Sequence, residues 1–190
     1  MTGDDPDAGL LARLGQGDEA AARQITHAKL PRVLALARRI LGDAQEAEDV
    51  AQDTFLRVWR HAGRWRPGAA HFDTWLHTVT LNLCRDRLRR RREATIAALP
   101  EVADPALSAD VAIDQAARAH RVAAAIAALP DRQREAILLV HYQDLGNIAA
   151  AQVLDVSVDA LESLLARGRR ALRKSLEETE PEMDRSGDRP

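Results

Sequence analysis

The sequence predicts an all-α protein of two small helical domains joined by a flexible linker. Alanine and leucine dominate the 190 residues and only 3% are aromatic, a bias that favours helices over strands. Apolar residues recur at helical spacing in both halves of the chain. Between the halves, "EATIAALPEVADPALSADV" (93–111) has little periodicity and contains two prolines, which is typical of a linker.

The first half begins with a helical pattern over 10–41. Pro31 lies inside this pattern, so we expect two helices, with a break before the proline. Gly42 should end the second of them. Asp43 opens a D-x-x-E capping pattern, which predicts that the next helix runs over about 44–61.

A Gly- and Pro-containing stretch over 63–73 predicts a loop. Asp73 is placed to cap a long helix over about 74–92. The apolar face of this helix is expected at Phe72, Leu76, Val79 and Leu83.

The second half predicts helices over 116–129, 130–142, 148–154 and 158–176, with turns at 143–147 and 155–157. Ser157 should cap the last helix. The last two helices, joined by a short turn, match a helix-turn-helix. The inner face of the last helix carries Val158, Leu161, Leu165 and Leu172, and Gly168 allows close packing.

The outer face of that helix is polar at its N-terminal end and basic at its C-terminal end, as in a helix that enters the major groove. Arg167 is suited to read guanine, while Arg169, Arg170 and Arg173 are suited to meet phosphates. The alternative is a surface helix with a solvated basic face.

Charge is segregated along the chain, although the net charge is only −2. Residues 43–53 are acidic, 57–66 and 167–174 are basic, and 85–92 contain six arginines. A chain patterned in this way can bind a polyanion and a basic partner at once.

Five of the six aromatic residues lie between Phe55 and Trp75, beside these arginines. Aromatic rings interleaved with arginines suit single-stranded nucleic acid, because bases stack on the rings. Phe55, Trp59 and Trp75 occupy helical positions and are expected in the core. Trp65 lies in the loop, where it is a candidate for stacking.

Several classes of function are disfavoured. The chain has one cysteine, which excludes an intramolecular disulfide and argues against a cysteine-based zinc site. His61, His71, His77 and Cys84 lack metal-ligand spacing, and Cys84 is expected as a buried thiol, with a redox role as the alternative. We expect no cofactor, no metal, no small-molecule substrate and no catalytic residues. No apolar run reaches the ~20 residues of a membrane span, and the N-terminus lacks a signal pattern, so a cytoplasmic location is expected.

Two segments together resemble extracytoplasmic-function (ECF) sigma factors, subunits of bacterial RNA polymerase. "DAQEAEDVAQDTFLRVWRHAGRWRPGAAHFDTWLHTVTLNLCRDRLRRRR" resembles sigma region 2, and "ALPDRQREAILLVHYQDLGNIAAAQVLDVSVDALESLLARGRRALR" resembles region 4. The resemblance implies a region 2 domain over 8–93, a linker over 94–113, a region 4 domain over 114–177 and an acidic tail over 178–190.

The resemblance also implies partners and contact residues. The acidic helix would dock on the clamp coiled coil of core polymerase through Asp49, Gln52, Asp53, Phe55 and Trp59. The −10 element, as single-stranded promoter DNA, would meet Trp65, Ala69, Ala70, His71, Asn82, Arg85, Arg89 and Arg90. The −35 element, as duplex, would meet Ser157, Asp159, Glu162, Ser163, Ala166, Arg167, Arg169 and Arg170.

Three further expectations follow from the resemblance. The 130–142 helix would touch the polymerase flap. An anti-sigma factor would wedge between the two domains. Glu162 stands where many members have a basic residue, so the −35 sequence preference is expected to differ. The alternatives are a sigma-like decoy that sequesters an anti-sigma factor without initiating transcription, and a conventional helix-turn-helix repressor.

Overall fold

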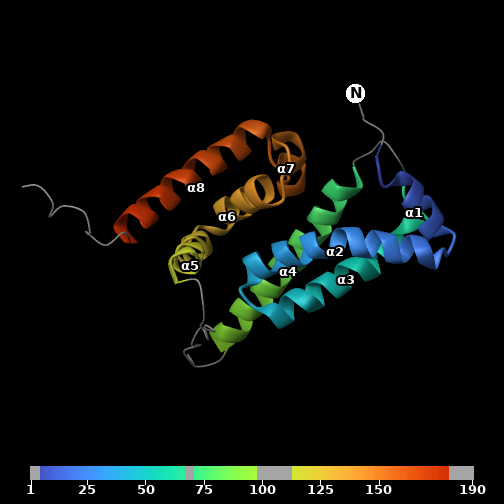
Figure 1. Cartoon of the computed structure of the whole chain (residues 1–190), viewed down its shortest axis with the longest axis horizontal. Coiled ribbons are helices and arrows are strands. Elements are labelled where there is room, and N and C mark those ends of the chain that lie inside the picture. Colours follow the sequence, from blue (N-terminus) through green and yellow to red (C-terminus); the bar gives the residue numbers. More distant parts are fainter. Residues whose placement is uncertain (1–4, 67–70, 98–112, 180–190) are drawn as a thin grey trace, which may run out of the picture.

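The computed structural model describes residues 5–66, 71–97 and 113–179, and these are helical with no strand (Figure 1). The all-α prediction is confirmed. The N-terminal helices are α1 (Ala8–Gly15), α2 (Glu19–Leu41), α3 (Ala44–Ala62) and α4 (Phe72–Ala97). The C-terminal ones are α5 (Ile113–Ala127), α6 (Asp131–Ile137), the π-helical turn η1 (Leu138–Tyr142), α7 (Asn147–Leu154) and α8 (Val158–Thr179).

The predicted break at Pro31 is wrong, because α2 continues through the proline. The chain turns earlier instead, at Gly17, whose φ is 85°. Asp18 then caps α2 by accepting hydrogen bonds from the N–H groups of Ala20 and Ala21 at 2.8 and 3.2 Å. Proline removes one hydrogen bond from the helix, but α2 buries seven side chains against its neighbours. This tertiary packing outweighs the local cost of the proline.

The expected end of α2 and start of α3 are confirmed. Gly42 has a left-handed conformation (φ 68°) and its N–H donates to Arg38 O. This is a common way for a helix to end at glycine. The Asp43 side chain accepts a hydrogen bond from Glu46 N at 2.8 Å, so the capping pattern acts as predicted.

The prediction that Asp73 caps the next helix is wrong. Helix α4 begins at Phe72, and the Phe72 N–H donates to Asp5 Oδ2 at 2.9 Å. Asp73 lies in the first turn, where its Oδ1 is 2.8 Å from Lys29 Nζ. Lys29 Nζ also lies 2.6 Å from Asp7 Oδ2. The residues before α1 therefore stabilise the start of a helix far along the chain.

The four N-terminal helices pack as a bundle in which α2 lies along both α3 and α4. The expected face of α4 is buried, with Phe72, Leu76, Val79 and Leu83 all at most 9% exposed. The ends of α1 and α3 meet at two glycines: a Cβ built on Gly15 would lie 2.7 Å from Gly63 Cα. Only a residue without a side chain allows this approach.

The C-terminal helices form the predicted helix-turn-helix. The turn between α7 and α8 passes through Asp155 in a left-handed conformation (φ 54°). Ser157 Oγ accepts from Ala160 N at 3.1 Å, as expected of a cap. Gly168 packs against α6, since a Cβ there would lie 3.1 Å from Ile137 Cγ1. The expected 130–142 helix is α6 followed by the π-helical η1.

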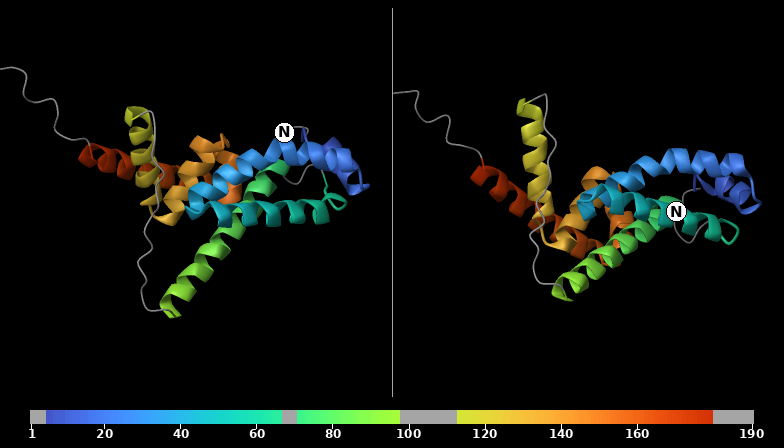
Figure 2. Two further views of the ribbon diagram at one scale, coloured as in Figure 1. Left: turned by 60° about the horizontal axis from the view of Figure 1, so that its bottom comes forward. Right: turned by 90° about the horizontal axis from the view of Figure 1, so that it is seen from below.

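The two groups of helices contact each other directly. Helix α4 packs against α7, and α2 packs against η1. One continuous apolar cluster includes Leu81 and Leu83 of α4 together with Leu138 and Leu139 of η1. The last turns of α4 extend beyond the ends of α2 and α3 (Figure 2).

The ends of three helices bear on the expected boundaries. Helix α4 runs to Ala97, past its expected end, α5 starts earlier than expected, and α8 runs to Thr179. Most of the expected linker (98–112) and of the acidic tail (180–190) lies outside the described residues, and the domain boundaries stay predictions. Within the described ranges, no helix combines the length and apolar character needed to cross a membrane.

Candidate functional site

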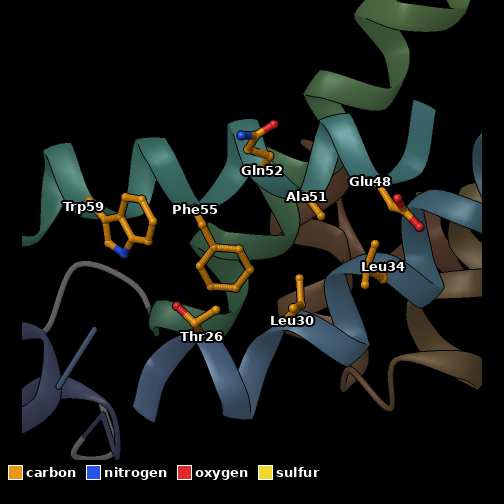
Figure 3. Close-up of a pocket in the computed structure, with 8 residues that line it drawn as sticks. All are labelled: Thr26, Leu30, Leu34, Glu48, Ala51, Gln52, Phe55 and Trp59. Atoms are coloured by element: carbon orange, nitrogen blue, oxygen red, sulfur yellow. The ribbon is translucent and has the colours of Figure 1, made fainter. Parts of the chain in front are cut away.

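A groove about 290 Å³ in volume separates α2 from α3 (Figure 3). Its floor and walls are largely apolar. The lining residues are Thr26, Leu30 and Leu34 of α2 and Glu48, Ala51, Gln52, Phe55 and Trp59 of α3. Three of the five predicted polymerase-docking residues therefore line one concave surface, with Gln52 at the rim and the two aromatic rings inside (Figure 3).

Trp59 is not a core residue, contrary to the expectation from its helical position. It is 47% exposed, whereas Phe55 is 4% exposed. Trp75 is half-buried and packs against both apolar clusters. Helical spacing predicts which residues share a face, but Trp59 is near the end of α3, where the facing helix leaves the groove open. A soluble protein rarely leaves a tryptophan exposed in an apolar hollow without a partner for it.

The other two predicted docking residues, Asp49 and Asp53, lie one turn apart on the adjoining face of α3. Their carboxylates lie 3.3 and 3.7 Å from the guanidinium of Arg87 on α4. Each acidic side chain is nearly half exposed. The groove is thus bordered by carboxylates, which suits a partner that is apolar at its centre and basic along its edge.

Trp65 lies in an aromatic cluster at the start of α4. Its ring meets Phe72 and Trp75 edge-on, with centroids 5.7 and 5.9 Å apart. His61 stacks on Trp75 at 5.0 Å. Trp65 is therefore half-buried, more enclosed than expected for a loop residue, and its buried Nε1 has no hydrogen-bond partner within the described residues.

The other predicted −10 contacts of the loop are only partly described. His71 is exposed, and Ala69 and Ala70 lie outside the described residues. Asn82 is exposed on α4, seven residues after Trp75. That separation is about 10 Å along a helix and returns to the same face. The structure does not bring Trp65 and Asn82 into contact, but it places Asn82 two turns along α4 from the Trp65 cluster.

The six arginines of 85–92 divide into three sets. Arg87 and Arg91 face α3: Arg87 meets Asp49 and Asp53, and Arg91 Nη2 lies 2.6 Å from Glu46 Oε2. Arg89 pairs with Asp86 of its own helix at 3.1 Å, one of the two pairings expected for that aspartate, and Arg90 is exposed.

The third set faces the C-terminal domain. Arg85 Nε and Nη2 donate to the two carboxylate oxygens of Glu135 at 2.8 and 2.7 Å. Arg92 Nη2 donates to Asp131 Oδ2 at 2.7 Å. The hydrogen bond from Glu135 raises the pKa of Arg85, and the one from Arg92 lowers the pKa of Asp131. One predicted −10 contact, Arg85, is thus paired across the domain junction.

All eight predicted −35 residues are exposed along one side of α8 or at its cap: Ser157, Asp159, Glu162, Ser163, Ala166, Arg167, Arg169 and Arg170. The opposite side packs into the domain, with Leu161 and Leu165 buried and Val158 and Leu172 partly buried. Glu162 Oε1 accepts from Asn147 Nδ2 at 3.3 Å. The helix has the two-sided character predicted for a recognition helix.

Two buried titratable groups lie near the domain junction. His77 Nδ1 lies 2.6 Å from Asp73 O and its Nε2 lies 3.2 Å from Gln143 Oε1. Burial lowers the pKa of His77, and these hydrogen bonds offset part of the effect. Burial, helped by the charges of Glu135 and Glu46, raises the pKa of the Cys84 thiol to about 12. Cys84 is therefore the buried thiol expected from the sequence.

Sequence reasoning missed the residues that join the domains. Glu135 and Gln143 are polar yet 4% and 1% exposed. Gln143 O accepts from the Arg32 guanidinium, and Gln143 Nε2 donates to Arg32 O at 3.3 Å. Tyr142 packs under the Arg39 guanidinium, 4.6 Å from ring centroid to Cζ. Each side chain has an ordinary surface role in its own helix, so no local signal marks it as a junction residue.

Comparison with known proteins identifies both halves of the chain. The family described as Sigma-70 region 2 matches residues 26–94. The family described as Sigma-70, region 4 matches residues 119–172. These segments include the α2–α3 groove, the arginines of α4 and the helix-turn-helix.

Curated relatives agree with these matches. The ECF RNA polymerase sigma factor SigM of Mycobacterium tuberculosis is 33% identical, with 90% of this chain and 84% of that protein covered. SigW of Bacillus subtilis is 29% identical, covering 87% and 94%. SigE of Mycolicibacterium smegmatis is 34% identical over 84% of this chain, which spans only 64% of that protein's length.

Two solved structures share the fold over most of the chain. CnrH, in complex with the cytosolic domain of CnrY, superposes with a TM-score of 0.69 at 28% identity, covering 92% of this chain and 99% of that one. RpoE of Bartonella quintana, in complex with the anti-sigma factor NepR, gives a TM-score of 0.67 at 23% identity, covering 83% and 98%. Together with the sequence matches, they confirm the resemblance stated above: the chain belongs to the ECF RNA polymerase sigma factors.

Proposed function

We propose that this chain binds core RNA polymerase and directs it to promoters, acting in the cytoplasm as an initiation subunit without catalytic residues or a cofactor. The observation that carries the proposal is the α2–α3 groove. Gln52, Phe55 and Trp59 line an apolar hollow with carboxylates beside it. A helix of the clamp coiled coil that is apolar at its centre and basic at its edge complements both features.

The −10 element is proposed to bind as single strand between the Trp65 cluster and the arginines of α4. A base rotated out of its stack needs a ring to stack on and a polar group to read its edge. Trp65 would supply the ring and Asn82, about 10 Å further along the same face of α4, would read a base edge. Arg85, Arg89 and Arg90 would meet the phosphates, together with the loop residues Ala69 to His71.

The −35 element is proposed to bind α8 as duplex in the major groove. The exposed side of α8 offers polar side chains near its N-terminus and arginines further on, in the order that suits base edges and then phosphates. Glu162 is positioned by Asn147. A carboxylate can accept a hydrogen bond from cytosine N4, so we expect a cytosine preference at the base pair that Glu162 faces.

An anti-sigma factor is the proposed regulator. The two similar structures are complexes, one of CnrH with CnrY and one of RpoE with the anti-sigma factor NepR. A partner that wedged between the domains of this chain would have to replace the contacts of α4 with α6 and α7. A partner that covered the α2–α3 groove would block polymerase without separating the domains.

The test is run-off transcription with core polymerase on templates selected from genomic DNA by the reconstituted holoenzyme. We expect promoter-dependent transcripts, lost in Trp65→Ala and Asn82→Ala although both variants still bind core polymerase. A chain that binds core polymerase but never yields a promoter-dependent transcript would be a decoy. Tight, sequence-specific DNA binding without polymerase would indicate a repressor and overturn the proposal.

A further inference from the structure

Two arginines of α4 and two acids of α6 join the domains of this chain. Glu135 receives both donors of the Arg85 guanidinium, at 2.8 and 2.7 Å, and its side chain is only 5% exposed. Arg132 lies 3.6 Å from the same carboxylate. Asp131, one turn earlier on α6, meets Arg92 at 2.7 Å. A bidentate guanidinium–carboxylate pair has fixed geometry as well as charge.

These pairs lie on the face of α4 that is proposed to hold the promoter strand. Asn82, Arg85, Arg89 and Arg92 follow one another at intervals of three, four and three residues, which places them on one side of a helix. Helix α6 lies against this side, so its carboxylates take the positions that phosphates would need. Carboxylate and phosphate bind arginine through the same pair of N–H groups.

The rest of the junction does not involve the proposed strand contacts. Gln143 meets Arg32 and His77, and Tyr142 packs under Arg39. The remaining arginines of the cluster either face α3 or point into solvent. The Arg85–Glu135 and Arg92–Asp131 pairs are therefore the part of the described junction that would compete with DNA.

We propose that the Asp131–Glu135 edge of α6 covers the strand-binding face of α4 in the free chain, so that the domains must separate before the promoter strand can reach Arg85. The carboxylates of α6 act as internal substitutes for phosphates. This inference rests on the proposed role of Arg85 in binding the promoter strand. Polymerase binding that draws the domains apart would expose Arg85 at the stage when DNA is loaded.

The test combines domain closure and strand binding in the full-length chain. Glu135→Gln keeps the shape of the side chain but removes its charge, alone or with Asp131→Asn. Asp86→Asn is the matched control, because Asp86 is paired with an arginine but only within α4. Small-angle scattering measures the radius of gyration, and fluorescence anisotropy measures affinity for a labelled oligo(dT), since phosphate contacts are independent of sequence.

We expect Glu135→Gln with Asp131→Asn to enlarge the radius of gyration and to bind oligo(dT) at least about tenfold more tightly than the unaltered chain. Asp86→Asn should change affinity less than twofold. The exchange Arg85→Glu with Glu135→Arg should restore a compact chain without restoring strand affinity.

Two results would overturn the inference: unchanged compactness in Glu135→Gln with Asp131→Asn, or an expanded variant with unchanged strand affinity. Run-off transcription by the unaltered holoenzyme separates this failure from failure of the proposed function. Promoter-dependent transcripts beside either overturning result would leave the function intact. Absence of transcripts would reject the function, while the radius of gyration would still report whether these pairs close the chain.

Discussion

Removing the exposed ring of Trp59 should weaken binding to core polymerase and leave the fold intact. Trp59 is 47% exposed in an otherwise apolar groove, and a tryptophan side chain offers up to about 250 Å². The exposed part is therefore roughly 120 Å², which at about 25 cal/mol per Å² contributes up to about 3 kcal/mol if a partner covers it fully. Trp59→Ala should then raise the Kd for core polymerase between about tenfold and a hundredfold.

The assay is a titration of fluorescently labelled core polymerase with each variant. Trp59→Phe should show an intermediate loss, because the smaller ring covers less area. Arg57→Ala is the matched control: Arg57 is also exposed on α3, but on the side away from the groove. A Kd for Trp59→Ala within twofold of the unaltered chain, at unchanged melting temperature, would refute the docking role of the groove.

Three further predictions concern the fold. Gly15→Ala should destabilise the chain by more than about 1 kcal/mol because its Cβ meets backbone at 2.7 Å, whereas Gly9→Ala, with open space around it, should stabilise it by up to about 1 kcal/mol; urea denaturation measures both. The pKa of His77 is lowered on folding, so the unfolded chain binds this proton more readily and stability should fall as pH drops below about 6.5, the ordinary histidine pKa, towards the lowered value. Cys84, with a pKa of about 12, should not react with a disulfide reagent at pH 8 until the chain unfolds.

Each of these predictions has its own control. His77→Gln should reduce the loss of stability between pH 7.5 and 5.5, whereas the exposed His120→Gln should not. An unchanged slope in His77→Gln would assign the pH dependence elsewhere. Equal effects of the two alanine substitutions in α1 would show that the close approach to α3 is not limiting. Rapid reaction of the folded thiol would contradict its burial.

Local signals in the sequence predicted most of the fold. The caps at Asp43 and Ser157, the terminator Gly42 and the apolar face of α4 depend on residues a few positions apart, and all are confirmed. Pro31 was misjudged because tertiary packing of α2 outweighs a single missing hydrogen bond. Asp73 was misjudged because its place as a cap is taken by Asp5 from the other end of the domain.

The candidate site was less accessible from sequence. Helical spacing placed Phe55 and Trp59 on one face but could not show that one ring is buried and the other open to solvent. The arginine cluster was recognised as basic, yet its division among α3, α6 and solvent depends on the placement of whole helices. The charge of Arg85 is visible in the sequence, but its partner Glu135 lies 50 residues away in another domain.

The segment before α1 makes the folded N-terminal unit larger than the part of the chain that its family shares. The region 2 match begins at residue 26, yet Asp5 caps α4 and Asp7 neutralises the half-buried Lys29. A fragment trimmed to the matched boundaries would leave the Phe72 N–H without its acceptor and Lys29 with fewer counter-charges. Truncation for expression, or a fusion joined immediately before Asp5, would therefore act on the aromatic cluster at the start of α4 from more than sixty residues away in the chain.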